Sequence, residues 1–292
     1  MTIRIALVTC AALPHLDDDD RLLLVPLRAA GAEVVVAVWD DPAVEWAAFD
    51  LAVIRSTWDY TSRRDDFVAW ARSVPRLANP ADVVEWNTDK RYLADLEAAG
   101  LPVVPTTWIA DPAAALPEQG SVVVKPAVGA GSIDAARYAM HDDHEAQQAR
   151  EHARRLIDAG RTVMVQPYME AIELNGETGV IFVAGEYSHG IRKGPMLVGQ
   201  KQLEDGGLFA RESISSRDPS GAELRVARRA VAAVPGGSER VLYARVDLVA
   251  DAAGAPVIIE LELTEPSLFM STARGAEHRF ARAILDRAGA GP

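Results

Sequence analysis

Acidic side chains recur at short spacing near the end of the chain. Glu260 and Glu262 lie in an apolar run typical of a buried strand (VIIELEL), and Asp247 lies in the preceding run of the same kind (ARVDLV). Side chains two apart on a strand share a face, and a hairpin brings the third carboxylate opposite them. Three close carboxylates raise one another's pKa unless a cation lies among them. The spacing predicts a Mg²⁺ site; the alternative is an exposed acidic hairpin face.

A lysine followed by glycines forms a second candidate site. Lys125 ends the apolar run VVVK, and Gly129, Gly131 and Ser132 follow. A buried lysine needs an anion, and glycines let backbone N–H groups approach one closely. The pattern indicates phosphate binding. The stretch GAGSID lacks the third glycine of the dinucleotide fingerprint, and no stretch matches a Walker loop.

Two weaker signals accompany this pair. Lys90 lies on a predicted helix, where a lone lysine is most simply a solvated one. A strand ends at VQPYM, where backbone groups could contact an adenine edge and an acid just beyond could hold ribose hydroxyls. The residues concerned are Gln166, Pro167, Tyr168 and Met169, followed by the acids Glu170, Glu173 and Glu177.

Substrate contacts are expected at two strands and one turn. The residues following a predicted parallel strand lie where ligands gather on such sheets; they are Arg55, Ser56, Thr57, Trp58 and Asp59. The alternative there is an amphipathic loop with Trp58 packed inward. His189, Arg192 and Lys193 lie on a predicted hairpin strand and could contact a substrate anion, or could belong to a surface strand. Ser267 and Glu265 lie past the acidic strand, where Glu265 is expected to shape a turn or to contact substrate.

The elements that must position these residues follow two patterns. In the first third, the apolar runs IRIALVT, EVVVAVW and LAVIRS alternate with predicted helices at 20–30 and 65–73, as in a parallel sheet with crossover helices. Beyond it we expect a helix capped by Asn87 or Thr88 and ending at Gly100, and a hairpin over 177–193 that turns at Gly185. Further expected elements are helices at 142–159, 222–234 and 274–288 and a flexible loop at 199–216.

Composition limits the class of protein. A formal net charge of −12 argues against a nucleic-acid partner. The single cysteine, Cys10, excludes an internal disulfide and a cysteine-rich zinc site. No cationic leader and no apolar run of membrane-spanning length is present. These features predict a cytoplasmic protein with no membrane partner, and a homo-oligomer is the base-rate expectation.

Taken in chain order, these segments resemble the ATP-grasp superfamily. The matching segments are NTDKRYLADLEAAGLPVVPTTW, VVVKPAVGAGS, VQPYME, ARVDLV and IELELTEPSLF. The resemblance implies an α/β fold, α+β in its C-terminal half, with ATP between two antiparallel sheets. It also implies an N-terminal α/β substrate domain (1–85), a central lid domain (86–166) and a C-terminal domain with the metal site (167–292).

The resemblance assigns roles to the candidate residues. Lys90 and Lys125 would contact the ATP phosphates, under the loop from Gly129 to Ser132. The segment from Gln166 to Met169 would line adenine, and Glu170, Glu173 or Glu177 would hold the ribose. The expected Mg²⁺ ligands are Asp247, Glu260 and Glu262, the last of which is Asn in many members. Arg245 would steady the transferring phosphoryl group, with Lys125 as the second catalytic residue.

The implied reaction is the joining of a carboxylate to a nitrogen through an acyl phosphate, with release of ADP and phosphate. Within the superfamily the chain resembles the D-cycloserine synthetase subgroup, which cyclises O-ureido-D-serine. The alternatives are an intermolecular amino-acid or peptide ligase, of the glutathione synthetase or ribosomal-protein glutamate ligase type, and a nucleotide-binding regulator without turnover. A Rossmann-type dehydrogenase is disfavoured because the third fingerprint glycine is missing.

Overall fold

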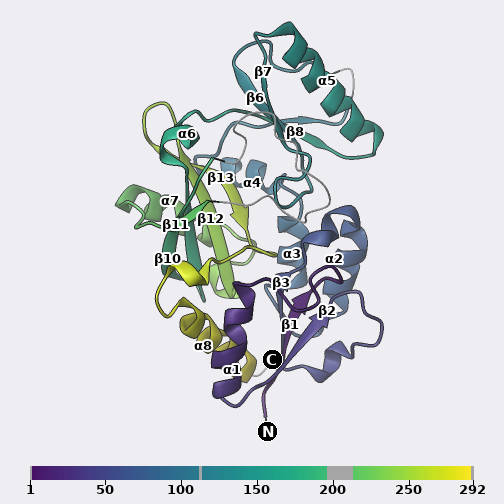
Figure 1. Cartoon of the computed structure of the whole chain (residues 1–292), viewed down its shortest axis with the longest axis vertical. Coiled ribbons are helices and arrows are strands. Elements are labelled where there is room, and N and C mark those ends of the chain that lie inside the picture. Colours follow the sequence, from purple (N-terminus) through teal and green to yellow (C-terminus); the bar gives the residue numbers. More distant parts are fainter. Residues whose placement is uncertain (1, 112–113, 196–212, 291–292) are drawn as a thin grey trace.

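Three β-sheets form the framework of the protein (Figure 1). The computed structural model describes residues 2–111, 114–195 and 213–290. No helix in these ranges is long and apolar enough to cross a membrane. One sheet is parallel and the other two are antiparallel, which matches the sheet arrangement that the sequence predicts.

The N-terminal sheet has the order β2-β1-β3-β4, and all its pairs are parallel. Its strands are β1 (Arg4–Thr9), β2 (Glu33–Val38), β3 (Leu51–Ser56) and β4 (Leu77–Ala78). The connections contain η1 (Asp20–Leu23), α1 (Leu24–Ala29), η2 (Trp46–Ala48), η3 (Trp58–Ser62) and α2 (Arg64–Ser73). The helix predicted at 20–30 is divided into η1 and α1. Pro26 explains this, because proline lacks an N–H and is tolerated only in the first turn of an α-helix.

The helix predicted from Asn87 or Thr88 to Gly100 is wrong at its start. Two helices occupy this stretch, α3 (Ala81–Asn87) and α4 (Tyr92–Ala98), and Gly100 follows the second with φ of 77°. Asn87 ends α3 instead of capping α4. Its side-chain amide donates to the Leu261 carbonyl at 2.7 Å and its oxygen accepts from the Leu263 N–H at 2.7 Å. The Asn87 side chain therefore forms tertiary hydrogen bonds with β13 and the residue after it, and not the helix cap that the sequence pattern predicts.

The central sheet has the order β5-β8-β6-β7 and lies at one end of the molecule, at the top of Figure 1. Its strands are β5 (Thr107–Ile109), β6 (Ser121–Pro126), β7 (Ala136–Ala139) and β8 (Val163–Pro167). The helix predicted at 142–159 is present as α5 (Asp143–Asp158), and the Asp142 carboxylate caps it by accepting the N–H groups of His144 and Glu145. The apolar face of α5 packs on this sheet through Ala149 and Leu156.

The C-terminal sheet has the order β11-β10-β9-β12-β13. Its strands are β9 (Glu177–Val183), β10 (Glu186–Lys193), β11 (Ile214–Ser216), β12 (Tyr243–Ala250) and β13 (Pro256–Glu262). The predicted hairpin at 177–193 is confirmed, and Gly185 has the positive φ of 81° that its turn requires. Most of the loop predicted at 199–216 lies outside the described residues, and its last three residues form β11.

Helices cover this sheet and join it to the N-terminal one. The helices are α6 (Ala171–Asn175), α7 (Gly221–Ala232) and α8 (Ala276–Gly289), with η4 (Ser238–Arg240) and η5 (Met270–Thr272). The helix α7 packs on β12 and β13, whereas α8 contacts β3, β9 and β10. One apolar core contains Leu7 and Val53 of the N-terminal sheet together with Tyr243 and Phe280. The Tyr243 hydroxyl, buried in this core, donates to the carbonyls of Ile54 and Thr264 at 3.0 and 2.9 Å.

Candidate active site

A cavity of about 380 Å³ is lined by residues of the central and C-terminal sheets and of the segments that follow strands of the N-terminal sheet. The central sheet contributes Lys125 and Gln166, the C-terminal sheet contributes Arg245 and Glu260, and the turn after β3 contributes Trp58. A volume of this size suits a small-molecule site. The cavity therefore brings together residues that are far apart in the sequence and that belong to each of the predicted site groups.

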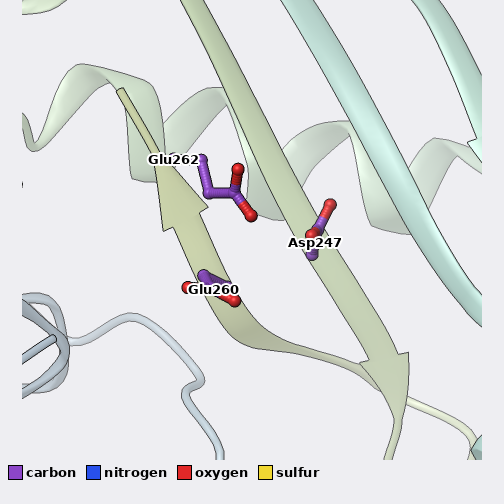
Figure 2. Close-up of side chains that lie close together, drawn as sticks. All are labelled: Asp247, Glu260 and Glu262. Atoms are coloured by element: carbon purple, nitrogen blue, oxygen red, sulfur yellow. The ribbon is translucent and has the colours of Figure 1, made fainter. Parts of the chain in front are cut away.

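The three predicted metal ligands converge on the face of the β12–β13 hairpin that lines this cavity (Figure 2). Asp247 pairs with Glu260 in the ladder, and one oxygen from each of Asp247, Glu260 and Glu262 lies within 4.8 Å of the others. Asp247 is fully buried, and the two glutamates are partly exposed. Oxygen donors that leave room for water and phosphate oxygens suit Mg²⁺. The donor set thus fits the ion that the sequence predicts.

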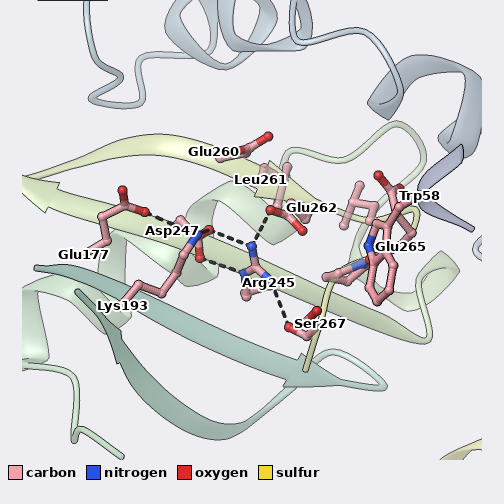
Figure 3. A network of polar contacts seen from close by, with 12 residues as sticks. Trp58, Glu177, Lys193, Arg245, Asp247, Glu260, Leu261, Glu262, Glu265 and Ser267 are labelled. Carbon is pink, nitrogen blue, oxygen red and sulfur yellow. Dashed lines mark hydrogen bonds and ion pairs between the residues drawn. The ribbon is translucent and has the colours of Figure 1, made fainter. Parts of the chain in front are cut away.

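Three cations contact this acidic cluster, and two of them, Arg245 and Lys193, are labelled in Figure 3. Arg245 donates through Nε and Nη2 to the two oxygens of Asp247, both at 2.9 Å, and it also contacts Glu262. Lys193 lies 3.0 Å from Asp247 and 3.4 Å from Glu177, and the Lys90 ammonium lies 2.9 Å from Glu260. The cluster is therefore held by opposite charges.

The two acids of the β12–β13 ladder that contact Arg245 have pKa values shifted in opposite directions. Burial raises the pKa of Glu262 to about 8, since the repulsion of Glu260 and Asp247 adds to it and Arg245 only partly offsets it. Burial acts in the same direction on Asp247, but the charges of Arg245 and Lys193 outweigh it and lower the pKa of this carboxyl to about 2. Asp247 is consequently more firmly ionised than Glu262.

The glycine-bearing loop lies beside Lys90 and Lys125. Lys90 donates to the Gly129 carbonyl at 2.5 Å, so it bridges this loop and the acidic cluster. Burial lowers the pKa of Lys125, which has no ion-pair partner among the described residues. Gly131 and Ser132 both have positive φ, near 60°. The loop and the two lysines therefore lie together on the cavity wall.

The end of β8 lines the cavity, but only one of the three acids that follow it does so. Gln166, Pro167, Tyr168 and Met169 all line the cavity, and Arg137 lies 3.7 Å from the ring centroid of Tyr168. Of the three acids predicted for ribose binding, Glu177 lines the cavity, beside Lys193. Glu170 and Glu173 do not line it: both are exposed, and Glu173 pairs with Arg137 at 2.5 Å.

The predicted substrate contacts after β3 need correction. Trp58 lines the cavity, as expected, whereas Arg55, Ser56, Thr57 and Asp59 do not. Arg55 is fully buried, pairs with Asp20 at 2.9 Å and lies over the ring of Tyr243. Ser56 donates to the same aspartate at 2.7 Å, Thr57 is fully buried, and Asp59 accepts from Trp39 and Arg63. These side chains hold the turn that presents Trp58.

The predicted contacts on β10 are likewise divided. Lys193 lines the cavity, and so does Ser267. His189 and Arg192 do not line it, which corrects the prediction. The His189 ring is buried with Nε2 2.8 Å from the Leu268 carbonyl, and Arg192 donates to the Asn175 carbonyl at 2.7 Å. Strand alternation separates Arg192 from Lys193, because neighbouring residues point to opposite faces of the sheet. His189 is instead held away from the cavity by its contact with the Leu268 carbonyl.

Several cavity residues had no assigned role in the sequence interpretation. They are Asp17, Asp19, Tyr92 and Phe269. Tyr60, the second aromatic of the predicted substrate segment after β3, also lines the cavity, and so does Asn87, which the sequence suggested only as a helix cap. Asp17 and Asp19 lie in a run of acids without periodicity, and only the docking of that run against residues 270 and 271 places it at the cavity.

Comparisons with known proteins agree with this arrangement. A family model described as the N-terminal domain of D-cycloserine synthetase DcsG matches residues 5–79. Cycloserine biosynthesis protein DcsG of Streptomyces lavendulae is 38% identical over 296 residues, which cover 97% of this chain and 98% of that protein. The crystal structure of D-cycloserine synthetase DcsG is 36% identical, with a TM-score of 0.85 and coverage of 98% and 99%.

More distant structures share the fold alone. The RimK domain ATP-grasp protein from Sphaerobacter thermophilus is 20% identical, with a TM-score of 0.69 and coverage of 98% of this chain and 100% of that one. D-alanine–D-alanine ligase from Bacillus anthracis is 13% identical, with a TM-score of 0.67 and coverage of 98% and 97%. The chain belongs to the D-cycloserine synthetase family of ATP-grasp ligases.

Proposed function

We propose that this ATP-dependent carbon–nitrogen ligase cyclises O-ureido-D-serine to D-cycloserine, with ADP and phosphate as products of the activation. Support comes from the near full-length similarity to DcsG. The structural observation that carries the proposal is the position of Arg245, which contacts the acids Asp247 and Glu262 and also the Ser267 carbonyl inside one cavity. One cation thereby joins the predicted metal ligands to the segment at Ser267, and we infer that the substrate carboxylate binds beside it.

The reaction follows from the chemistry of the groups in the cavity. A carboxylate resists attack by nitrogen, so the substrate carboxylate first takes the γ-phosphoryl group of ATP and ADP leaves. The nitrogen bonded to oxygen in the same substrate then attacks the acyl carbon, phosphate leaves, and the nitrogen loses its proton. Hydrolytic loss of the carbamoyl group completes D-cycloserine. Positioning and charge stabilisation suffice for the activation, so no protein nucleophile is required.

We assign the residues as follows. Lys90, Lys125 and the loop from Gly129 to Ser132 hold the ATP phosphates, and Gln166 to Met169 line adenine. Glu177 is the ribose acid because, of the three candidates, it alone lines the cavity. Asp247, Glu260 and Glu262 hold Mg²⁺, which supplies positive charge next to the phosphates. Arg245 stabilises the phosphoryl group during transfer, beside the substrate carboxylate.

The proposal extends to the wider organisation of the protein. We keep a division into residues 1–85, 86–166 and 167–292, since each sheet falls largely within one of these stretches. A cytoplasmic location is supported by the single, buried cysteine, and a homo-oligomer by the frequency of such assemblies among enzymes.

The test is release of ADP by the purified protein. We expect release only when Mg²⁺ and a carboxylate substrate are both present, and hydroxylamine should trap the acyl phosphate as a hydroxamate. Glu260→Gln should reduce the rate by about 100-fold or more, because it removes a charged Mg²⁺ ligand. Glu97→Gln on the exposed face of α4 is the matched control and should retain the rate. Formation of AMP and pyrophosphate would contradict phosphoryl transfer to the carboxylate.

A further inference from the structure

Three successive carbonyl groups after β13 are each held by a buried side chain, and Figure 3 shows the contact between Arg245 and Ser267. The Glu265 carbonyl accepts from Trp58 Nε1 at 3.1 Å, and the Ser267 carbonyl accepts from Arg245 Nη1 at 2.8 Å. Between them, the Pro266 carbonyl accepts from Arg55 Nη2. Two of the donors belong to the N-terminal sheet region and one to β12. The segment 265–267 is therefore fixed from both sides of the cavity.

This segment presents the Glu265 side chain on the cavity wall. Glu265 is 9% exposed, and its carboxylate accepts a hydrogen bond from the Tyr60 hydroxyl. Among the described residues, no lysine or arginine nitrogen lies within 4.0 Å of this carboxylate. The four acids of the metal cluster and its border (Asp247, Glu260, Glu262 and Glu177) differ in this respect, since each has a cationic partner. Within the described part of the chain, Glu265 is thus a buried carboxylate without a contacting cation, and the charge of Lys90 acts on it only from a greater distance.

The surrounding wall adds negative charge. Asp17 and Asp19 line the same cavity, and neither has a cationic partner within the described ranges. Asp19 accepts the N–H groups of Met270 and Ser271 at 2.8 and 2.9 Å, which attaches it to the chain just past Glu265. Arg245, on β12, is already shared between Asp247, Glu262 and the Ser267 carbonyl. Lys90, whose charge acts on Glu265, is already paired with Glu260.

A buried carboxylate without a countercharge is costly, and a cationic ligand removes the cost. Burial raises the pKa of Glu265 to about 7, and the charge of Glu260 adds to this effect. The ionised form of Glu265 is therefore disfavoured. A ligand ammonium group in contact with the Glu265 carboxylate would favour the ionised form of this carboxylate. In an amino acid, the ammonium is attached to the carbon next to the carboxylate. A substrate carboxylate at Arg245 therefore holds its ammonium close to the segment 265–267.

We propose that Glu265 recognises the α-ammonium group of an amino-acid substrate, with Asp17 and Asp19 supplying further negative charge at the same end of the cavity. The proposal deepens the proposed function, on which it rests for the position of the carboxylate. The enzyme selects a free amino acid over its des-amino and N-acylated counterparts. The Tyr60 hydroxyl and the Trp58 contact position Glu265 for this role.

The test compares two substrates and two proteins. The substrates are O-ureido-D-serine and its des-amino analogue, 3-(ureidooxy)propanoate, and the proteins are the wild type and Glu265→Gln. We expect kcat/KM of the variant to fall by about 100-fold for the amino substrate, mainly through KM, because the contact is a charged hydrogen bond in a buried site. The des-amino substrate should react within about twofold in both proteins, because it makes no such contact.

Controls separate this role from a structural one. The KM for ATP should be unchanged in Glu265→Gln, Glu265→Asp should regain part of the loss, and Glu97→Gln on the surface should behave as wild type. Equal loss for both substrates would overturn the proposal. If the wild type shows no turnover, calorimetry in the presence of a non-hydrolysable ATP analogue measures binding of the two substrates instead. If the wild type binds the amino substrate without turning it over and Glu265→Gln weakens this binding, recognition is supported and the cyclase function is contradicted. Equal binding of both substrates would overturn the recognition.

Discussion

Arg245 and Asp247 form a two-point ion pair along one strand. The Nε and Nη2 atoms of the arginine each lie 2.9 Å from a different oxygen of the carboxylate, two residues further along β12. Both side chains are almost fully buried. The same guanidinium also contacts Glu262 and the Ser267 carbonyl, so four acceptor oxygens share one planar cation.

Replacement of Arg245 by lysine should reduce kcat by about 100-fold at saturating ATP and Mg²⁺, with a smaller change in the KM for ATP. A lysine ammonium is a point charge and cannot donate to all these oxygens in one plane. Steady-state ADP release measures the effect, and Arg282→Lys on the exposed face of α8 is the control. A loss below threefold would show that Arg245 has no part in the transfer.

The phosphate loop should depend on Arg161. This arginine lies 2.5 Å from the Asp134 carboxylate and donates to the Val128 carbonyl at 3.1 Å, so it joins the two ends of the loop. We expect Arg161→Gln to raise the KM for ATP by about tenfold, because ATP binding must then supply the free energy that orders the loop. Thermal stability should change little, since a partly exposed ion pair contributes at most about 1 kcal/mol. A rise confined to the KM of the carboxylate substrate would refute this role; Arg161→Lys should regain part of the affinity.

Asn79 should be a strong determinant of stability. It is fully buried with φ of 58°, its amide donates to the Tyr243 and Leu263 carbonyls, and its oxygen accepts from the Leu242 N–H. Asn79→Ala leaves these backbone groups unsatisfied and should lower the free energy of unfolding by about 3 kcal/mol or more. Urea denaturation measures the loss. The exposed Asn175→Ala should cost less than about 0.5 kcal/mol, and equal effects of the two variants would contradict the account.

His152 should make stability depend on pH. Burial, aided by the charge of Arg155, lowers the pKa of His152 from 6.5 to about 4. Between these values the unfolded chain binds a proton that the folded protein excludes, so stability is complete above about pH 6.5 and falls as the pH drops toward 4. His152→Gln should flatten this part of the profile, whereas the exposed His144→Gln should preserve it. Denaturation midpoints across this range give the answer, and an unchanged slope in His152→Gln would contradict the assignment.

The sequence predicted the elements whose signal is local. Strand alternation placed Glu260 and Glu262 on one face, and the hairpin placed Asp247 opposite, as the ladder confirms. The turn at Gly185 and the amphipathic helix α5 followed from residue types within a few positions. Such features depend on periodicity and on backbone conformation, both of which a single segment specifies.

The errors arose where a distant partner decides the role of a side chain. Arg55 lies at the carboxyl end of a parallel strand, yet Asp20 and the Pro266 carbonyl occupy its guanidinium below the cavity wall. Asn87 has the chemistry of a cap, but residues 261 and 263 use its amide. Local patterns contain no information on such partners. The same reason explains why no signal assigned Asp17 and Asp19 to the cavity.

The most direct test of the account is the product formed from O-ureido-D-serine by the purified protein with ATP and Mg²⁺ and no second amine. We predict D-cycloserine by mass spectrometry, with ADP released in equal amount and both lost in Glu260→Gln. An obligatory requirement for a separate amine, with a linear amide as product, would contradict cyclisation and identify an intermolecular ligase.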